Sequence, residues 1–343
     1  MPDKVFKTYD EQIGVMKCRG LRIGNDDQVT RVLRHENYYN VINGYKLLFV
    51  DGKDADSNDV FRTGTDFSEI YALFQFDMAM RNACLERILE VERHLKSAIA
   101  YEFSQRYGHK HTDYLCRQNF DAIACPNQET WRTPAWLTEE EWTGTPNDEP
   151  ATRIKTYADE MIESVSNAIT EAHNVYNSSI RHYEDKYGYL PLWVMVNILT
   201  MGTTTKFYRC MHSDDRKLVS DRFCINPNVL AKLLHCLTLF RNCCAHGARL
   251  YEFKLTHYPI PKTRWDYEVG LRTDERCSLE DRHSKAFSLM IILRMLLPPD
   301  SFRSLCGEVD TLMTTLTPEL HKISIDDVKH EMAFPSDWHH MVP

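Results

Sequence analysis

One short segment, from Phe240 to Tyr251, holds the residues whose types and spacing best fit catalysis. Arg241 is followed five residues later by His246, and Asn242 stands directly after the arginine. Histidine titrates near neutral pH and can move protons to and from oxygen atoms. Arginine keeps its charge, and its planar guanidinium can hold two phosphate oxygens. The segment can therefore serve phosphodiester chemistry without a metal. The alternative is that Arg241 extends from an apolar stripe to solvent and His246 only interacts favourably with the helix dipole.

The spacing limits how these side chains can meet. On an ideal helix Asn242 and His246 are about 40° apart around the axis and share a face. Arg241 and His246 are about 140° apart, so one regular helix cannot place both on one phosphate. Two alternatives remain. Either the last turn is distorted near Gly247, or two copies of the chain share a composite site, which predicts a homodimer.

A helix ending at this segment must position it. Asn226 is a suitable N-cap, Pro227 suits the first helical position and Gly247 suits the C-cap. One apolar stripe follows the helix: Leu230, Leu233, Leu234, Leu237, Phe240 and Cys244. Arg241 falls within this stripe, and His246 points roughly away from it.

Helical periodicity also dominates the rest of the chain. It predicts one bent helix or two helices from Asp66 or Ser68 to Gly108, a helical stretch from Arg153 to about Tyr187, a segment from Pro191 closed by Gly202, and a helix from Lys285 to Leu297. An inserted loop at 120–152, an excursion at 256–283 and a loose tail after Phe334 are expected between and after them. The 13 glycines among 343 residues fall below the usual share of about 7%, which also favours an all-α fold.

Composition and charge restrict the function classes. The net charge of −8 means that any contact with nucleic acid needs a local basic patch. Eleven cysteines without C-x-x-C pairs, and an N-terminus unlike a secretory leader, indicate reduced thiols in the cytoplasm. The longest apolar run, Ala286 to Leu297, contains Arg294 and is too short to cross a membrane. Glycine-rich phosphate loops and G-x-S-x-G elbows are absent, which argues against P-loop NTPases and α/β-hydrolases.

Five blocks of sequence carry a resemblance to a known family. They are YYNVINGYKLLF (38–49), FRTGTDFSEIYALFQFDMAMR (61–81), ERHLKSAIAYEFSQRYG (92–108), YGYLPLWVMVNILTMGTTTKFY (187–208) and LFRNCCAHGARLYE (239–252). In these blocks the chain resembles the Abi family of abortive-infection proteins (AbiD/AbiF-like), a branch of the HEPN superfamily. The last block is the most specific.

The resemblance implies a HEPN-type helical bundle that dimerises and cleaves RNA without a metal through an R-x4–6-H motif. Arg241 would bind and orient phosphate, His246 would transfer protons and Asn242 would assist, leaving a 2′,3′-cyclic phosphate and a 5′-hydroxyl. The chain would act as an effector in anti-phage defence or in a toxin–antitoxin setting. A third interpretation is a regulatory protein that a small-RNA or protein antitoxin holds. The alternative is a non-catalytic HEPN module that binds RNA or a partner protein.

With that resemblance the chain divides into an N-terminal helical or irregular extension (1–60), a HEPN-like helical domain (61–300) that includes both inserts, and a C-terminal segment and tail (301–343). The inserts at 120–152 and 256–283 are longer than the family core needs. No role is assigned to them.

Other polar residues are candidates for RNA contact. Arg249 and Tyr251 could hold phosphate and stack on a base, or they could solvate the helix end and pack in the core. Arg93 and Lys96 could supply polar groups to the cleft from the long helix. Alternatively, Lys96 forms a surface ion pair with Glu92, four residues before it.

The sequence gives less support to a metal site or a redox site than to the Arg241–His246 segment. The 51–59 stretch lacks the glutamate of a calcium loop, because Arg62 occupies the twelfth position from Asp51. A zinc site of His109, His111, Cys116 and Cys125 lacks paired ligand spacing. Adjacent cysteines rarely bridge, so Cys243 and Cys244 are expected to be free, with Cys244 in the core. No metal site is expected.

Overall fold

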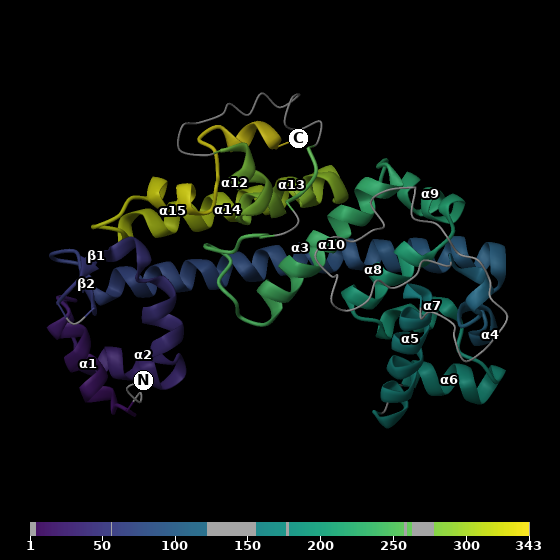
Figure 1. The fold of residues 1–343 in the computed structure, drawn as a ribbon, viewed down its shortest axis with the longest axis horizontal. Coiled ribbons are helices and arrows are strands. Elements are labelled where there is room, and N and C mark those ends of the chain that lie inside the picture. Colours follow the sequence, from purple (N-terminus) through teal and green to yellow (C-terminus); the bar gives the residue numbers. More distant parts are fainter. Residues whose placement is uncertain are drawn as a thin grey trace. The chain divides into compact units, whose positions relative to one another are not determined.

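A computed structural model describes residues 5–55, 57–121, 156–175, 178–256, 259–262 and 278–342 (Figure 1). Within these ranges the regular elements are helices, apart from one antiparallel pair of short strands, β1 (Val50–Lys53) and β2 (Asp59–Phe61). The all-α fold is therefore confirmed. No helix in the described ranges is long and apolar enough to span a membrane.

The chain forms two compact units. Unit 1 contains Met1–Arg87 and Asn242–Pro343, and unit 2 contains Ile88–Arg241. The boundaries fall inside two continuous helices, α3 (Phe67–Tyr107) and α10 (Pro227–Ala245). The domain limits expected from the sequence stay a prediction.

Unit 1 begins with helices whose starts are fixed by local caps. Thr8 forms a capping box with Glu11, and the side chain of Asn25 accepts a hydrogen bond from the backbone of Gln28. Its elements are α1 (Tyr9–Cys18), α2 (Asp26–His35), a π-helix (Tyr39–Asn43), a 3₁₀ turn (Leu47–Phe49), β1, β2, the first part of α3, the end of α10, α12 (Leu279–Ser284), α13 (Ala286–Leu296), α14 (Pro299–Leu316), a 3₁₀ turn (Thr317–Glu319), α15 (Ile325–Glu331) and a 3₁₀ turn (Trp338–Met341). Nearly every residue of α13 is buried, so this helix forms much of the unit's core.

The C-terminal tail is packed, and the expectation of a loose tail is wrong. Trp338 is 1% exposed and stacks edge-on against Phe334, which meets Phe287 in the same way. The Nε of Arg294 donates a hydrogen bond of 2.9 Å to the carbonyl of Met341. Two aromatic anchors and one charged hydrogen bond hold this segment against α13.

Unit 2 packs around the second part of α3. Phe103, Phe120 and Phe207 form a ring cluster with centroids 5.1–5.3 Å apart. Its other elements are α4 (His111–Tyr114), a 3₁₀ turn (Arg117–Asn119), α5 (Tyr157–Asn174), α6 (Ser178–Tyr187), α7 (Leu192–Met195), a 3₁₀ turn (Val196–Ile198), α8 (Met201–Cys210), α9 (Ser213–Asp221) and most of α10. The buried carboxylate of Asp215 accepts hydrogen bonds from Arg106 and Tyr107.

Several helix limits differ from the sequence expectations. The 66–108 pattern is one continuous helix, and Asp66 caps it by accepting from the backbone of Ser68. Gly202 does not close a helix. It lies inside α8, which begins after Thr200 because that side chain caps the backbone of Thr203 at 3.1 Å.

Two expected stretches also change. The expected helix at 153–187 is two helices, α5 and α6, and the excursion at 256–283 includes α12, capped by Ser278. Most of the expected insert at 120–152 lies outside the described residues.

Candidate functional site

The end of α10 has the local structure expected from its sequence. The side chain of Asn226 accepts from the backbone of Asn228 at 2.9 Å, and Pro227 is the first helical residue. The apolar stripe from Leu230 to Cys244 is buried. At the other end Gly247 has a φ of +73°, a left-handed conformation that glycine adopts without strain. Both caps and the stripe are confirmed.

The last turn of α10 is regular. The backbone N–H of His246 donates to the carbonyl of Asn242 at 3.0 Å, which continues the helical bonding past Ala245. Asn242 and His246 are both exposed and lie one turn apart on one face. Arg241 is half-buried and five residues from His246, so the structure does not show the distorted turn that would bring them together on one chain.

Arg241 has an unusual environment. Its Nε is buried and has no hydrogen-bond partner among the described residues. Buried polar groups are normally hydrogen-bonded, so an unsatisfied guanidinium nitrogen calls for an explanation. Further along the helix Cys243 and Cys244 are buried, and burial raises the pKa of the Cys243 thiol to about 12. These cysteines are core residues, as expected for Cys244.

Two candidate RNA contacts, Tyr251 and Lys96, are buried and bonded within the chain. Tyr251 is 1% exposed, its ring stacks on Tyr45 at 5.1 Å and its hydroxyl donates to the carbonyl of Gly44 at 3.3 Å. No face of this ring is open to a base. Lys96 is 8% exposed and lies 2.6 Å from Glu92, and its Nζ also donates to a backbone carbonyl at 2.7 Å. Lys96 and Glu92 therefore form a buried ion pair within unit 2 rather than a surface ion pair.

The other two candidates are accessible. Arg93 is exposed on α3 in unit 2. Arg249 is half-buried in unit 1, where its Nε donates to the carboxylate of Glu252. Arg93 is thus available for RNA contact, whereas Arg249 is already paired with Glu252.

A buried carboxylate that sequence reasoning missed fixes the segment after the motif. Asp77 is fully buried on α3 and accepts four hydrogen bonds, from the Tyr45 hydroxyl (2.8 Å), the Arg81 Nε (3.2 Å) and the backbone N–H groups of Leu250 (3.3 Å) and Tyr251 (2.7 Å). Burial raises the pKa of Asp77, and the four donors oppose this by favouring the charged form. The signal in the sequence is an Asp and an Arg four residues apart within an apolar helix.

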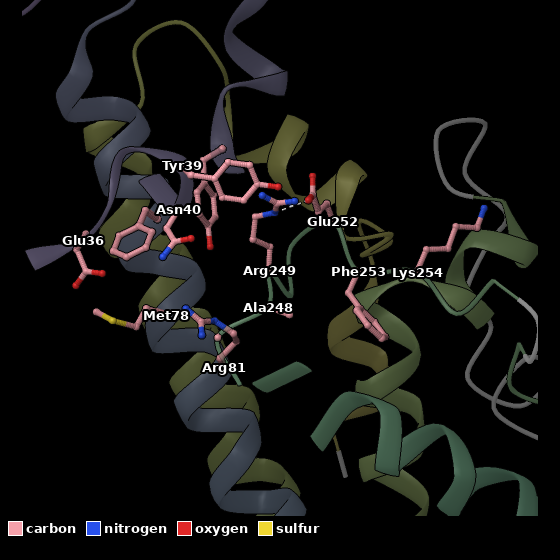
Figure 2. Close-up of a pocket in the computed structure, with 13 residues that line it drawn as sticks. Glu36, Tyr39, Asn40, Met78, Arg81, Ala248, Arg249, Glu252, Phe253 and Lys254 are labelled. Carbon is pink, nitrogen blue, oxygen red and sulfur yellow. Dashed lines mark hydrogen bonds and ion pairs between the residues drawn. The ribbon is translucent and has the colours of Figure 1, made fainter. Parts of the chain in front are cut away.

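A cleft of roughly 630 Å³ lies beside this network in unit 1 (Figure 2). It is lined by Glu36, Tyr39, Asn40, Tyr45, Phe74, Met78, Arg81, Gly247, Ala248, Arg249, Glu252, Phe253 and Lys254. A Cβ atom built on Gly247 would lie 3.7 Å from the Nη1 of Arg81. The cleft therefore reaches the backbone of the residue that directly follows His246.

The metal readings gain no support. The described residues contain no group of three or more His, Cys, Asp or Glu side chains placed to hold an ion. Asp54 accepts from the backbone of Asn58 at 2.8 Å, which closes the 51–59 turn within the chain. Cys125 lies outside the described residues.

Comparison with known families supplies the last observation. The family model described as Abi-like protein matches residues 31–252, which is more than half of the chain. The chain belongs to the Abi-like family. Comparisons with curated proteins and with solved structures give no match.

The Abi-like match includes both the R-x4-H segment and the residues beneath it. It covers Asp77, Arg81 and the whole of α10, and it ends at Glu252 in the wall of the cleft. Helices α12 to α15 of unit 1 lie beyond it. The family resemblance therefore extends over the motif and most of the cleft lining.

Proposed function

We propose that this Abi-like protein is a metal-independent endoribonuclease of the HEPN type that acts as an effector in abortive infection. Family membership supports the defence role. The observation that carries the catalytic role is Arg241, whose buried Nε has no partner among the described residues and which precedes the exposed His246 by five positions. An arginine whose guanidinium forms no hydrogen bond with another described residue is available to bind a phosphate.

The residue types define the reaction. His246 accepts the proton of an RNA 2′-hydroxyl, and that oxygen attacks the adjacent phosphorus. The bond from phosphorus to the 5′ oxygen breaks, and a protonated histidine gives that oxygen a proton. Arg241 stabilises the charge that builds on the phosphate, and Asn242 donates a hydrogen bond beside His246. The products are a 2′,3′-cyclic phosphate and a 5′-hydroxyl.

The helix geometry favours a site shared by two chains. Because the last turn of α10 is regular, Arg241 and His246 of one chain lie on different faces. In a homodimer, each site would combine residues of both copies. A small-RNA or protein antitoxin would then restrain the enzyme by covering this composite site.

Digestion of a labelled RNA in the presence of EDTA tests the proposal. The parent protein is expected to cut, and Arg241→Gln is expected to cut about 10²–10³-fold more slowly, the usual loss for one electrostatic stabiliser. Arg216→Gln is a matched control, because Arg216 is also half-buried with an unpartnered buried Nε, on α9. This control should cut at the parental rate.

Two outcomes would contradict the proposal. Cleavage that stops in EDTA would require a metal. RNA binding without cleavage by the parent protein would instead favour the non-catalytic binding module.

A further inference from the structure

The cleft of unit 1 contains a cation with unused donors. Arg81 is 9% exposed, and its Nε is committed to Asp77. Its two Nη groups have no hydrogen-bond partner among the described residues, and the side chain lines the cleft (Figure 2). A buried charge is costly unless it is paired on all sides. The fixed orientation and the open N–H groups of Arg81 therefore suit an anion that enters the cleft.

The opposite wall of the cleft offers an aromatic ring. Tyr39 is 59% exposed and Asn40 is exposed, and both lie on the π-helix Tyr39–Asn43. Figure 2 shows Tyr39 on the far side of the cleft from Arg81, and proteins use an exposed ring together with a cation to stack an unpaired base while holding its phosphate. The volume of roughly 630 Å³ lies within the usual range of about 300–1,000 Å³ for small-molecule sites.

The remaining charges of the cleft limit the ligand to one phosphate. Arg249 is paired with Glu252, and Lys254 lies 3.3 Å from Asp281. The carboxylates of Glu36 and Glu252 also line the cleft. A continuous track for a polyanion would need several unpaired cations. This cleft suits a single nucleotide unit.

We propose that the cleft binds one unpaired nucleotide of single-stranded RNA, with its phosphate on Arg81 and its base against Tyr39. The site is placed next to the reaction, because Arg81 lies against Gly247, the residue after His246. This assignment rests on the proposed ribonuclease function. Arg81 and Tyr39 are substrate-binding residues in it, and neither takes part in proton transfer.

Binding to an RNA that is not cut tests the site. The probe is a fluorescein-labelled hexauridylate, and its Kd for the His246→Ala protein is measured by anisotropy over a series of salt concentrations. Arg81→Gln is expected to weaken binding about tenfold and to make the slope of log K against log salt less negative by about 0.7, the share of one phosphate contact on a single strand. Arg81→Lys should recover part of both.

The aromatic contact is tested separately. Tyr39→Ala is expected to weaken binding by about tenfold, since base stacking contributes about 1–3 kcal/mol, and to leave the salt slope unchanged. Tyr101→Ala is the matched control, because Tyr101 is 58% exposed on α3 in unit 2. It should bind like the parent.

The outcomes separate the two proposals. If Arg81→Gln fails to fold, the exposed Tyr39 decides the matter, because its replacement removes no buried contact. An unchanged Kd for Tyr39→Ala, no binding of hexauridylate, or equal competition by polyglutamate would overturn the nucleotide site. Reduced binding by these variants in a protein that never cuts RNA would sustain the site and refute the ribonuclease. Cleavage at the parental rate by both variants would refute the nucleotide site and sustain the ribonuclease.

Discussion

Replacing His246 with alanine is expected to slow RNA cleavage by about 10³-fold, within the range for loss of a general acid or base. His246 is exposed, and its only hydrogen bond among the described residues is made by its backbone N–H. The substitution removes no described side-chain hydrogen bond and should leave the fold intact. Single-turnover cleavage of a labelled RNA, with a thermal unfolding curve of each protein, measures both expectations.

A second exposed histidine provides the comparison. His94 lies on α3 in unit 2 and is exposed. His94→Ala should cut at the parental rate. If His246→Ala cut as fast as the parent, His246 would have no part in proton transfer and the catalytic assignment would be wrong.

Replacing Asp77 with alanine is expected to lower the free energy of unfolding by about 4 kcal/mol, the usual cost of removing one partner of a buried ion pair. Four donors would lose their acceptor: Arg81, Tyr45 and the backbone N–H groups of Leu250 and Tyr251. Each buried donor left without a partner costs about 1–3 kcal/mol. Urea denaturation of the parent and the variant measures the difference.

An exposed ion pair gives the matched control. Asp26 lies 2.7 Å from Lys17, and about half of each side chain is exposed. Asp26→Ala should cost about 1 kcal/mol or less, because surface pairs contribute little. A loss for Asp77→Ala no larger than this would show that the buried network does not hold the segment after the motif.

Local signals allowed part of this fold to be predicted. The limits of α10 follow from Asn226, Pro227 and Gly247, which act on the backbone within one turn. The limits of α13 follow from an apolar run that ends before a proline pair. The start of α8 was missed because Gly202 resembled the end of a helix. Instead, the side chain of Thr200 caps a new helix that begins at Met201.

The candidate site was predictable only where it is continuous in sequence. Arg241, Asn242 and His246 were found because they share one segment. Asp77 and Arg81 lie more than 160 residues before the backbone groups they organise, and no local pattern reveals such a pairing.

The burial of two candidate residues escaped prediction for the same reason. Tyr251 and Lys96 have side chains that often contact RNA. Each is buried and donates a hydrogen bond to a backbone carbonyl that is distant in sequence. That carbonyl belongs to Gly44 for Tyr251 and to Leu199 for Lys96. Exposure of an amphipathic side chain depends on such tertiary partners.

The chemical ends left on RNA test the central claim most directly. The parent protein is incubated with a defined RNA in EDTA, and the termini of the products are identified by mass spectrometry. Attack by the 2′-hydroxyl through His246 and Arg241 predicts a 2′,3′-cyclic phosphate on one product and a 5′-hydroxyl on the other. Products with a 3′-hydroxyl and a 5′-phosphate, or an RNA that remains whole, would contradict the account.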